Sequence, residues 1–333
     1  MRCAIVAIGA GCLSAVAVAQ PVPSYGIDFV TVGAAGNRHT IPEEVPQAPW
    51  VQRGAVDYQY RLSRTEITIG QFAEFVTAYQ AARPGLYLSQ DADEVGRSEY
   101  LGVGPSGADY NPAHSQYPNQ PSWRMAARFC DWLHNGKINE RWAFESGAYD
   151  TSTFGFNPNI GYTDQFTRSP GARFWIPSIN EWVKGVFYDP NRYGAGQGGY
   201  WSFTNSSETL PISGLPGEGG ETNAGFNVPP NDFMNVGSYP NSQSPWGLLD
   251  TSGGTTEYTE DYSPQSTLRS SAGTYYADWG YFLGESPVLG GSTGLNPNSG
   301  GFGGLRLASA VPAPGAVVLG ALAAIGVGRR RRG

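Results

Sequence analysis

Apolar and polar residues alternate in two segments near the start of the chain, and this pattern predicts two strands. Residues 27–33 alternate weakly and lead into a turn over residues 34–37. Residues 56–62 alternate more strongly. Because successive side chains of a strand point to opposite faces, one face of each predicted strand can pack on a core.

Three residues with helix-capping side chains, Thr68, Ser122 and Ser178, each precede a predicted helix. Gln71 and Glu181 stand three residues after the first and third caps, which is the spacing of a capping box. Pro84-Gly85 and Asn135-Gly136 are the expected ends of the first two helices. The predicted apolar stripes are Phe72, Phe75, Val76 and Tyr79 in the first helix, Ala126, Phe129, Cys130 and Leu133 in the second, and Trp182 and Val186 in the third.

Residues 86–118 show no sustained period and indicate a long, irregular insertion rich in tyrosine. A loop of this length in a compact domain is often functional. From residue 188 onward the chain is rich in Gly, Asn, Pro and Ser, with short strand-like pieces. No internal repeat or linker divides it, so the sequence predicts one globular domain.

The stretch from Gly247 to Asp261 begins with an apolar pair, turns at residues 252–254 and then alternates like a strand. Four acids lie in it: Asp250, Glu257, Glu260 and Asp261. Carboxylates and backbone carbonyls that meet at a turn can hold a hard cation such as calcium. A polar turn between two core strands explains the same pattern, and both interpretations stay open from these residues.

The two ends of the chain have the patterns of export signals. Residues 1–19 run from Met-Arg through an apolar segment to Ala17-Val18-Ala19, the pattern of a cleaved signal peptide. At the other end, Val311-Pro312-Ala313-Pro314-Gly315 precedes an apolar run over 316–327 and four arginines at 329–332. That run is shorter than the ~20 residues of a spanning helix.

The C-terminal arrangement over residues 310–333 resembles the PEP-CTERM sorting signal of Gram-negative-type bacteria. This resemblance implies transient membrane anchoring, processing by an exosortase, and release to the cell surface or beyond. A simple C-terminal membrane tail is the alternative. Both interpretations predict an exported protein.

The charge argues against nucleic acid as a partner. The chain has 21 basic and 28 acidic residues. Without Arg2 and the arginines at 329–332, 16 basic residues remain against the 28 acids, a net charge of −12. Such an acidic domain is a poor match for nucleic acid or an anionic membrane. Of the three cysteines, Cys3 and Cys12 lie in the predicted signal peptide, and the remaining Cys130 cannot form an intramolecular disulfide.

Six blocks of sequence, in the expected order, resemble formylglycine-generating enzyme (sulfatase-modifying factor) domains. The resemblance implies an α+β fold, a single compact C-type-lectin-like domain with low regular secondary structure, here over residues 24–309. The blocks are RTEITIGQF at 64–72, QPSWRMAARFCDWL at 120–133, RFWIPSINEW at 173–182, VGSYP at 236–240 with GLLDTSGGTTEY at 247–258, LRSSA at 268–272 and GLRLA at 304–308.

The resemblance also implies copper-dependent oxidation chemistry. The enzymes of this family use a cysteine pair after the LRSSA position, which binds copper and activates oxygen. Residues 269–306 contain no cysteine, and a single thiol elsewhere cannot form the soft pair that a cuprous ion prefers. We therefore expect no copper and no formylglycine-forming oxidation. Cys130, on an apolar stripe, is expected to be a buried small hydrophobe.

The resemblance implies two other kinds of metal site. Related iron-dependent sulfoxide synthases use a histidine cluster, whereas His39, His114 and His134 are far apart in this sequence. The family also has structural calcium sites. Glu257 keeps the acid of one of them, Gly254 stands where the family has Asn, and Asn223 matches a ligand of the other site. A weak calcium site involving Glu257 and Asn223 is thus one hypothesis, and a satisfied polar turn is the other.

These observations lead to two functional hypotheses. The favoured one is an exported, non-catalytic domain that binds a peptide, a glycan or another envelope component, or that acts in the surface matrix. The alternative is an oxidoreductase of the same family with an altered metal site.

Overall fold

The computed structural model describes residues 22–46, 48–83, 101–104, 107–226, 233–263, 266–275, 294–301 and 303–312. Residues Ser24–Val311 form one compact unit. The predicted signal peptide at 1–19 lies outside the described residues. So does the predicted tail at 310–333, apart from its first three residues. The boundaries of these two segments stay predictions.

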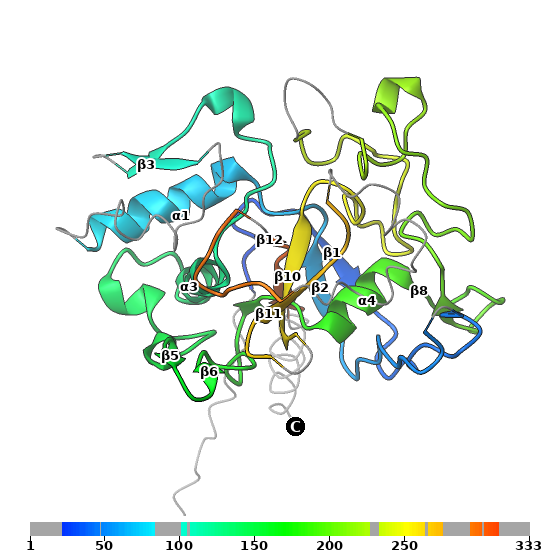
Figure 1. Ribbon diagram of the computed structural model, residues 1–333, viewed down its shortest axis with the longest axis horizontal. Helices are drawn as coiled ribbons and strands as arrows, with labels where there is room; N and C mark the ends of the chain where they lie inside the picture. Colours follow the sequence, from blue (N-terminus) through cyan, green and yellow to red (C-terminus); the bar gives the residue numbers. More distant parts are fainter. Residues whose placement is uncertain are drawn as a thin grey trace, which may run out of the picture. The chain divides into compact units, whose positions relative to one another are not determined.

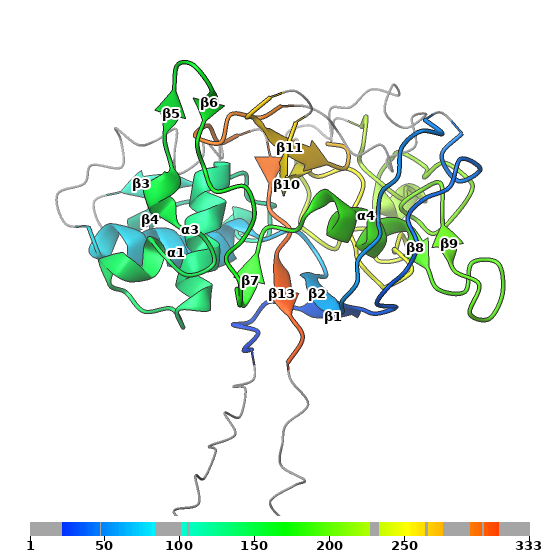
Figure 2. The same ribbon diagram turned by 90° about the horizontal axis from the view of Figure 1, so that it is seen from below.

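A four-stranded antiparallel sheet joins the two ends of the compact unit (Figure 2). The register places Leu62 opposite both Val30 and Ala308, at the centre of the sheet. The strands, in their order across the sheet, are β1 (Phe29–Val32), β2 (Tyr60–Ser63), β13 (Ala308–Ala310) and β7 (Phe174–Trp175).

Both predicted N-terminal strands exist, but the second begins later than its alternating pattern suggested. The first lies within the predicted range 27–33. The second starts at Tyr60, not Val56, because residues 57–58 form a bend. The N–H of Val56 donates to Asn37 Oδ1 at 3.2 Å instead of to a neighbouring strand. At this end of the strand, a side-chain acceptor takes the place of a backbone hydrogen bond to a neighbouring strand.

The second sheet has three strands and is built on the stretch after the glycine turn (Figure 1). Its central strand β10 (Thr256–Tyr262) confirms the strand predicted there. β11 (Arg269–Ala272) pairs with β10 in an antiparallel sense, and β12 (Gly303–Gly304) pairs with it in a parallel sense. Three of the sequence blocks therefore meet in this one sheet.

The three predicted helices are confirmed, with the predicted caps. α1 (Ile69–Ala81) and α4 (Ile179–Phe187) each begin with a complete capping box, and α3 (Trp123–His134) begins with the Ser122 hydroxyl accepting from Met125 N. Figure 1 shows α1 and α3 on one side of β10, with α4 on the other.

The main aromatic core lies between α1 and α3. Phe75 of α1 is its centre, with ring centroids 5.5 Å from Phe129, 5.8 Å from Trp132 and 5.9 Å from Phe144. All four side chains are buried. Rings in tilted and edge-to-face contact at these distances add attraction to the area they bury. Phe75 and Phe129 belong to the predicted apolar stripes, whereas Trp132 and Phe144 were not predicted to join them.

The described part of the predicted insertion is more regular than its sequence suggested. Residues 101–104 and 107–118 form a short hairpin and a 3₁₀ turn, and the hairpin packs on α1; residues 86–100 lie outside the described part. Short elements also fill the region after α3. The remaining elements are β3 (Gly102–Gly104), β4 (Gly107–Asp109), η1 (Pro112–His114), η2 (Arg141–Phe144), η3 (Thr151–Thr153), β5 (Phe156–Asn157), β6 (Gly161–Tyr162), β8 (Tyr188–Asp189), β9 (Gly199–Tyr200) and η4 (Pro216–Glu218).

The expected fold class is thus confirmed: a single compact α+β domain with small sheets and few helices. In the part of the chain that the structure describes, no helix is both long and apolar enough to cross a bilayer.

Candidate functional site

The turn before β10 needs its two glycines. Gly253 and Gly254 have φ of +82° and +63°, a region that favours glycine. A Cβ on Gly253 would lie 2.1 Å from Asn223 Oδ1. The N–H of Gly254 donates to the same oxygen at 2.8 Å. The turn is therefore closed tightly over Asn223.

Glu257, the first buried acid after the turn, is paired with Arg306. The guanidinium Nε lies 3.0 and 2.8 Å from the two carboxylate oxygens, and Nη2 lies 2.6 Å from Oε1. Trp182 Nε1 donates to Oε2 at 2.5 Å. Both charged side chains are at most 1% exposed. Burial by itself lowers the pKa of Arg306, but attraction to Glu257 outweighs it and the pKa lies above its ordinary value.

Two further carboxylates lie beside this ion pair. Glu66 accepts from the backbone N and hydroxyl of Thr255, at 3.0 and 2.5 Å. Burial, and then repulsion from Glu257 and Asp250, raise the pKa of Glu66 well above its ordinary range. Burial raises the pKa of Asp250 to about 6. Glu66, Asp250 and Asn223 line a cavity of about 10 Å³, room for about one water molecule.

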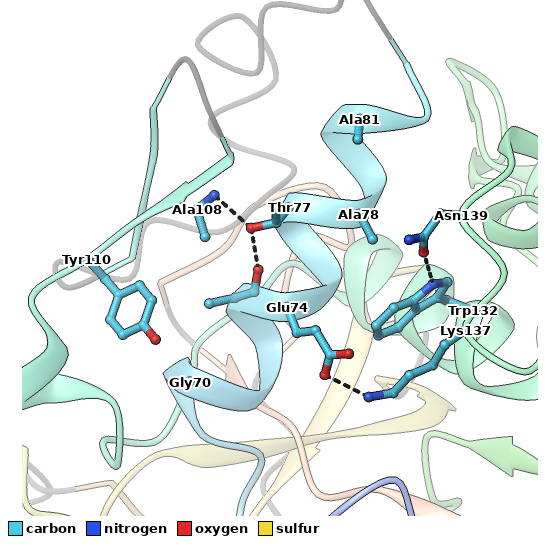
Figure 3. A pocket seen from close by; sticks show the side chains of 11 residues that line it. Gly70, Glu74, Thr77, Ala78, Ala81, Ala108, Tyr110, Trp132, Lys137 and Asn139 are labelled. Atoms are coloured by element: carbon cyan, nitrogen blue, oxygen red, sulfur yellow. Dashed lines mark hydrogen bonds and ion pairs between the residues drawn. The ribbon is translucent and has the colours of Figure 1, made fainter.

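A much larger pocket, of about 560 Å³, runs across the outer face of α1 (Figure 3). Its floor is made of small residues of α1. Tyr110, just after the hairpin, lies on one side, and Trp132, Lys137 and Asn139 lie on the other. The Lys137 ammonium is 2.6 Å from a Glu74 carboxylate oxygen. The described hairpin is thus one wall of an open, mixed polar and apolar pocket.

A second open pocket, of about 700 Å³, lies beside β7. Arg168 forms its inner wall, with its guanidinium carbon 4.2 Å from the Trp175 ring centroid. This side chain bonds Glu181 at 3.1 Å and Glu260 at 3.0 Å, and Tyr58 OH at 2.7 Å. Its hydrogen bonds are directed inward, to groups of the domain itself.

The sequence profile of the Sulfatase-modifying factor enzyme 1-like domain matches residues 29–299. This range covers most of the chain and five of the six sequence blocks. The chain belongs to the sulfatase-modifying-factor family.

Two solved structures of low sequence identity are similar to this family member. The crystal structure of CarF shares 16% identity, with a TM-score of 0.43 over 86% of this chain and 99% of that chain. The structure of PvdO from Pseudomonas aeruginosa shares 15% identity, with a TM-score of 0.44 over 88% of this chain and 98% of that chain. No curated protein matches the sequence.

The structure brings the two predicted calcium ligands, Glu257 and Asn223, to the same turn. Their oxygens, however, already accept hydrogen bonds from other groups of the protein. Both Glu257 oxygens accept from Arg306, and Asn223 Oδ1 accepts from Gly254. Calcium takes six to eight oxygen ligands, so an ion at Glu257 has to displace Arg306. Among the described residues, no group of three or more His, Cys, Asp or Glu is arranged to hold a metal. The calcium site stays a prediction.

Cys130, His134 and His114 contact neighbouring groups of the domain. Cys130 is buried in α3, and burial raises the pKa of its thiol well above the ordinary value. His134 Nδ1 accepts from Arg173 N at 3.1 Å, and the His114 ring stacks on Tyr117 at 4.8 Å. These side chains serve local structure.

Sequence reasoning missed four residues that define the two sites. Glu66 and Arg306 belong to recognised blocks, and a buried acid and base in separate blocks were a usable sign of an ion pair. Tyr110 and Lys137 gave no sign of their meeting, because the first lies in an irregular insertion and the second follows a helix end. Only the packing of the hairpin on α1 places them at one pocket.

Proposed function

We propose that this protein is an exported, non-catalytic member of the sulfatase-modifying-factor family that binds a component of the cell envelope through the pocket across α1. The observation that carries this proposal is the contrast between two sites. The family's central turn is filled by the domain's own ion pair, whereas the pocket across α1 is open and offers polar groups to a ligand.

The closed turn supports a structural role for the central motif. Glu257 accepts from Arg306 and Trp182, and Arg306 also donates to the backbone oxygens of Ser63, Arg64 and Leu249. These bonds tie β10 to the segment before α1 and to Leu249, through Arg306, which lies two residues before β13. A carboxylate with all of its acceptor sites used in this way is poorly suited to bind a substrate.

The open pocket supports a binding role. Its volume of about 560 Å³ is within the range of small-molecule sites, which combine an apolar lining with a few polar groups. Glu74 is exposed, Tyr110 is half-buried, and Asn139 is exposed. A ligand can therefore reach these side chains from solvent.

Export, and processing by an exosortase-type enzyme, are the parts of the proposal that rest on the sequence of the two ends. Fractionation of cells that carry a tagged chain tests them. Deletion of residues 2–19 is expected to retain the protein in the cytoplasm. Replacement of Arg329 to Arg332 by Ser is expected to stop its release, and release at the normal level would contradict the sorting role of the tail.

The alternative, an oxidoreductase with an altered metal site, is distinguished by metal analysis of the purified protein. Copper or iron at one atom per chain, retained through dialysis, would favour it. The binding proposal is tested by pull-down and glycan-array measurements with the purified protein. A specific partner whose binding is lost on Glu74→Gln supports the proposal, whereas turnover of a small substrate without any partner would contradict it.

A further inference from the structure

From the pocket across α1 we infer that its ligand is a neutral saccharide, such as a unit of an envelope polysaccharide. This inference rests on the proposed function and adds the chemical class of the ligand. The pocket is lined by the outer face of α1, by Ala108 in the hairpin and Tyr110 just after it, and by Trp132, Lys137 and Asn139 (Figure 3).

The hairpin is held on α1 by a close contact, so this wall of the pocket is fixed. Thr77 Oγ1 accepts from Ala108 N at 3.1 Å and donates to Ala73 O at 2.9 Å. Gly107 has φ of +122°, and a Cβ there would lie 2.7 Å from Thr77 Oγ1. Only glycine allows this approach. Tyr110 is thereby positioned across the helix from Lys137 (Figure 3).

The opposite wall carries a side chain whose backbone conformation is unusual. Lys137 has φ of +60°, in the left-handed region that glycine adopts far more readily. Its ammonium lies 5.0 Å from the Trp132 ring centroid and 2.6 Å from Glu74. Asn139 Oδ1 accepts from Trp132 Nε1 at 3.1 Å. A lysine at this position costs backbone energy and places a charged donor at the pocket.

The polar groups have capacity for a ligand on both sides of the pocket. Within the described part of the chain, one Glu74 oxygen, the Asn139 amide N–H groups and the Tyr110 hydroxyl have no protein partner. They combine acceptors, donors and a group that is both. A sugar hydroxyl both donates and accepts, so a sugar can bond to all three kinds of group. The half-buried Tyr110 ring and the methyl groups of Ala81 and Ala108 offer apolar contact to the faces of a sugar ring.

The charges of the pocket disfavour strongly ionic ligands. Glu74 and Lys137 form an ion pair, so the pocket carries no net charge. An anionic ligand meets the Glu74 carboxylate, and a cationic ligand meets the Lys137 ammonium, each of which disfavours it. Peptides are disfavoured because the floor consists of Ala73, Ala78, Ala81 and Gly70, which provide no deep hole for an anchoring side chain.

The test is titration of the full chain, by calorimetry, with defined trisaccharides. Maltotriose, cellotriose and mannotriose are the neutral probes, and trigalacturonate is the anionic probe. We expect saturable binding of at least one neutral probe and none of trigalacturonate. Lys137→Gly and Glu74→Gln are each expected to weaken that binding about tenfold or more, because each removes a charge-assisted hydrogen bond.

Two features of the variants separate binding from folding. Lys137→Gly keeps the left-handed backbone, so its thermal midpoint should stay close to that of the native protein while its affinity falls. Tyr110→Ala should also lose affinity. The matched controls are Glu43→Gln and Trp50→Ala, which alter an exposed acid and an exposed aromatic residue elsewhere and should bind normally.

The outcomes distinguish this inference from the proposed function. Neutral saccharide binding that is unchanged by all three pocket variants would overturn the pocket as the site. No saccharide binding, together with a peptide or other envelope component that is lost on Lys137→Gly, would overturn the ligand class and leave the proposed function intact. Stronger binding of trigalacturonate than of the neutral probes would overturn the charge argument.

Discussion

Arg306 and Glu257 lie 49 residues apart in the sequence and form a two-point ion pair at the centre of the domain, with distances of 2.6 to 3.0 Å. Glu66 and Asp250 are two more carboxylates near the same guanidinium, and after Glu257 their charges also raise the pKa of Arg306. One buried cation thus faces two buried acids, Glu66 and Glu257, and the half-buried Asp250. This imbalance raises the pKa of Glu66 and Asp250, with burial as the first cause.

Replacing Arg306 by Met should destabilise the protein by about 3–5 kcal/mol, because Glu257 would be left buried without its partner. The free energy of unfolding from urea titration measures this effect. The double variant Glu257→Gln with Arg306→Met should recover part of the loss, since it removes the uncompensated charge.

A small effect of Arg306→Met would contradict this structural role of the ion pair. If Arg306→Met costs less than about 1 kcal/mol, the usual contribution of an exposed ion pair, the cluster does not hold the fold in the way its burial indicates. Arg64→Met is the matched control, because Arg64 pairs with Asp28 in an ion pair whose two side chains are 37% and 68% exposed.

Local signals in the sequence predicted the local structure. Thr68 with Gln71 and Ser178 with Glu181 form the capping boxes that their spacing indicates, since a cap depends on only four adjacent residues. The family blocks likewise predicted the fold class. Neither kind of signal gave the partner of Glu257, because the sequence does not show which buried base faces a buried acid.

The pocket across α1 could not be predicted from the sequence. It depends on a glycine, Gly107, that lets a hairpin approach Thr77, and on Lys137 in a left-handed conformation. Both features come from tertiary packing, and the residues between 86 and 118 have no period that announces a hairpin. A long tyrosine-rich insertion indicated a functional loop, but not its position on the fold.

The two turn glycines should differ in their tolerance of side chains. Gly253→Ala should destabilise by more than about 2 kcal/mol, because it combines a positive φ with overlap at Asn223 and at the backbone N of Ala224. Gly254→Asn should cost less, because Asn accepts this conformation more readily and the nearest atom, 2.8 Å away, is Oε2 at the end of the Glu66 side chain and not a backbone atom. Thermal unfolding compares the two; an equal loss would contradict the geometry of the turn.

A calcium ion at Glu257 should bind weakly, because it competes with Arg306 for both carboxylate oxygens. We expect no change in the thermal midpoint in 0.1 mM calcium and a small rise at about 1 mM or above, the affinity range of weak extracellular sites. Magnesium at the same concentration is the control for ionic strength. A midpoint that falls by several degrees when EDTA is added to the purified protein would show a tight site and contradict this expectation.

Stability should depend on pH through Glu260, which accepts from Tyr149 OH and from Arg168. Burial, only partly offset by Arg168, raises the pKa of Glu260 to about 7 from an ordinary 4.5. A carboxyl whose pKa is higher in the folded state stabilises the fold fully below its unfolded pKa, and this contribution is lost as the pH rises through the folded pKa. Between pH 4.5 and 7 the loss from this group is roughly 3 kcal/mol. Glu260→Gln should flatten the pH profile of the unfolding free energy in that window, whereas Glu43→Gln, at an exposed site, should leave it unchanged; a profile that is equally steep in both variants would assign the dependence to other buried acids such as Glu66.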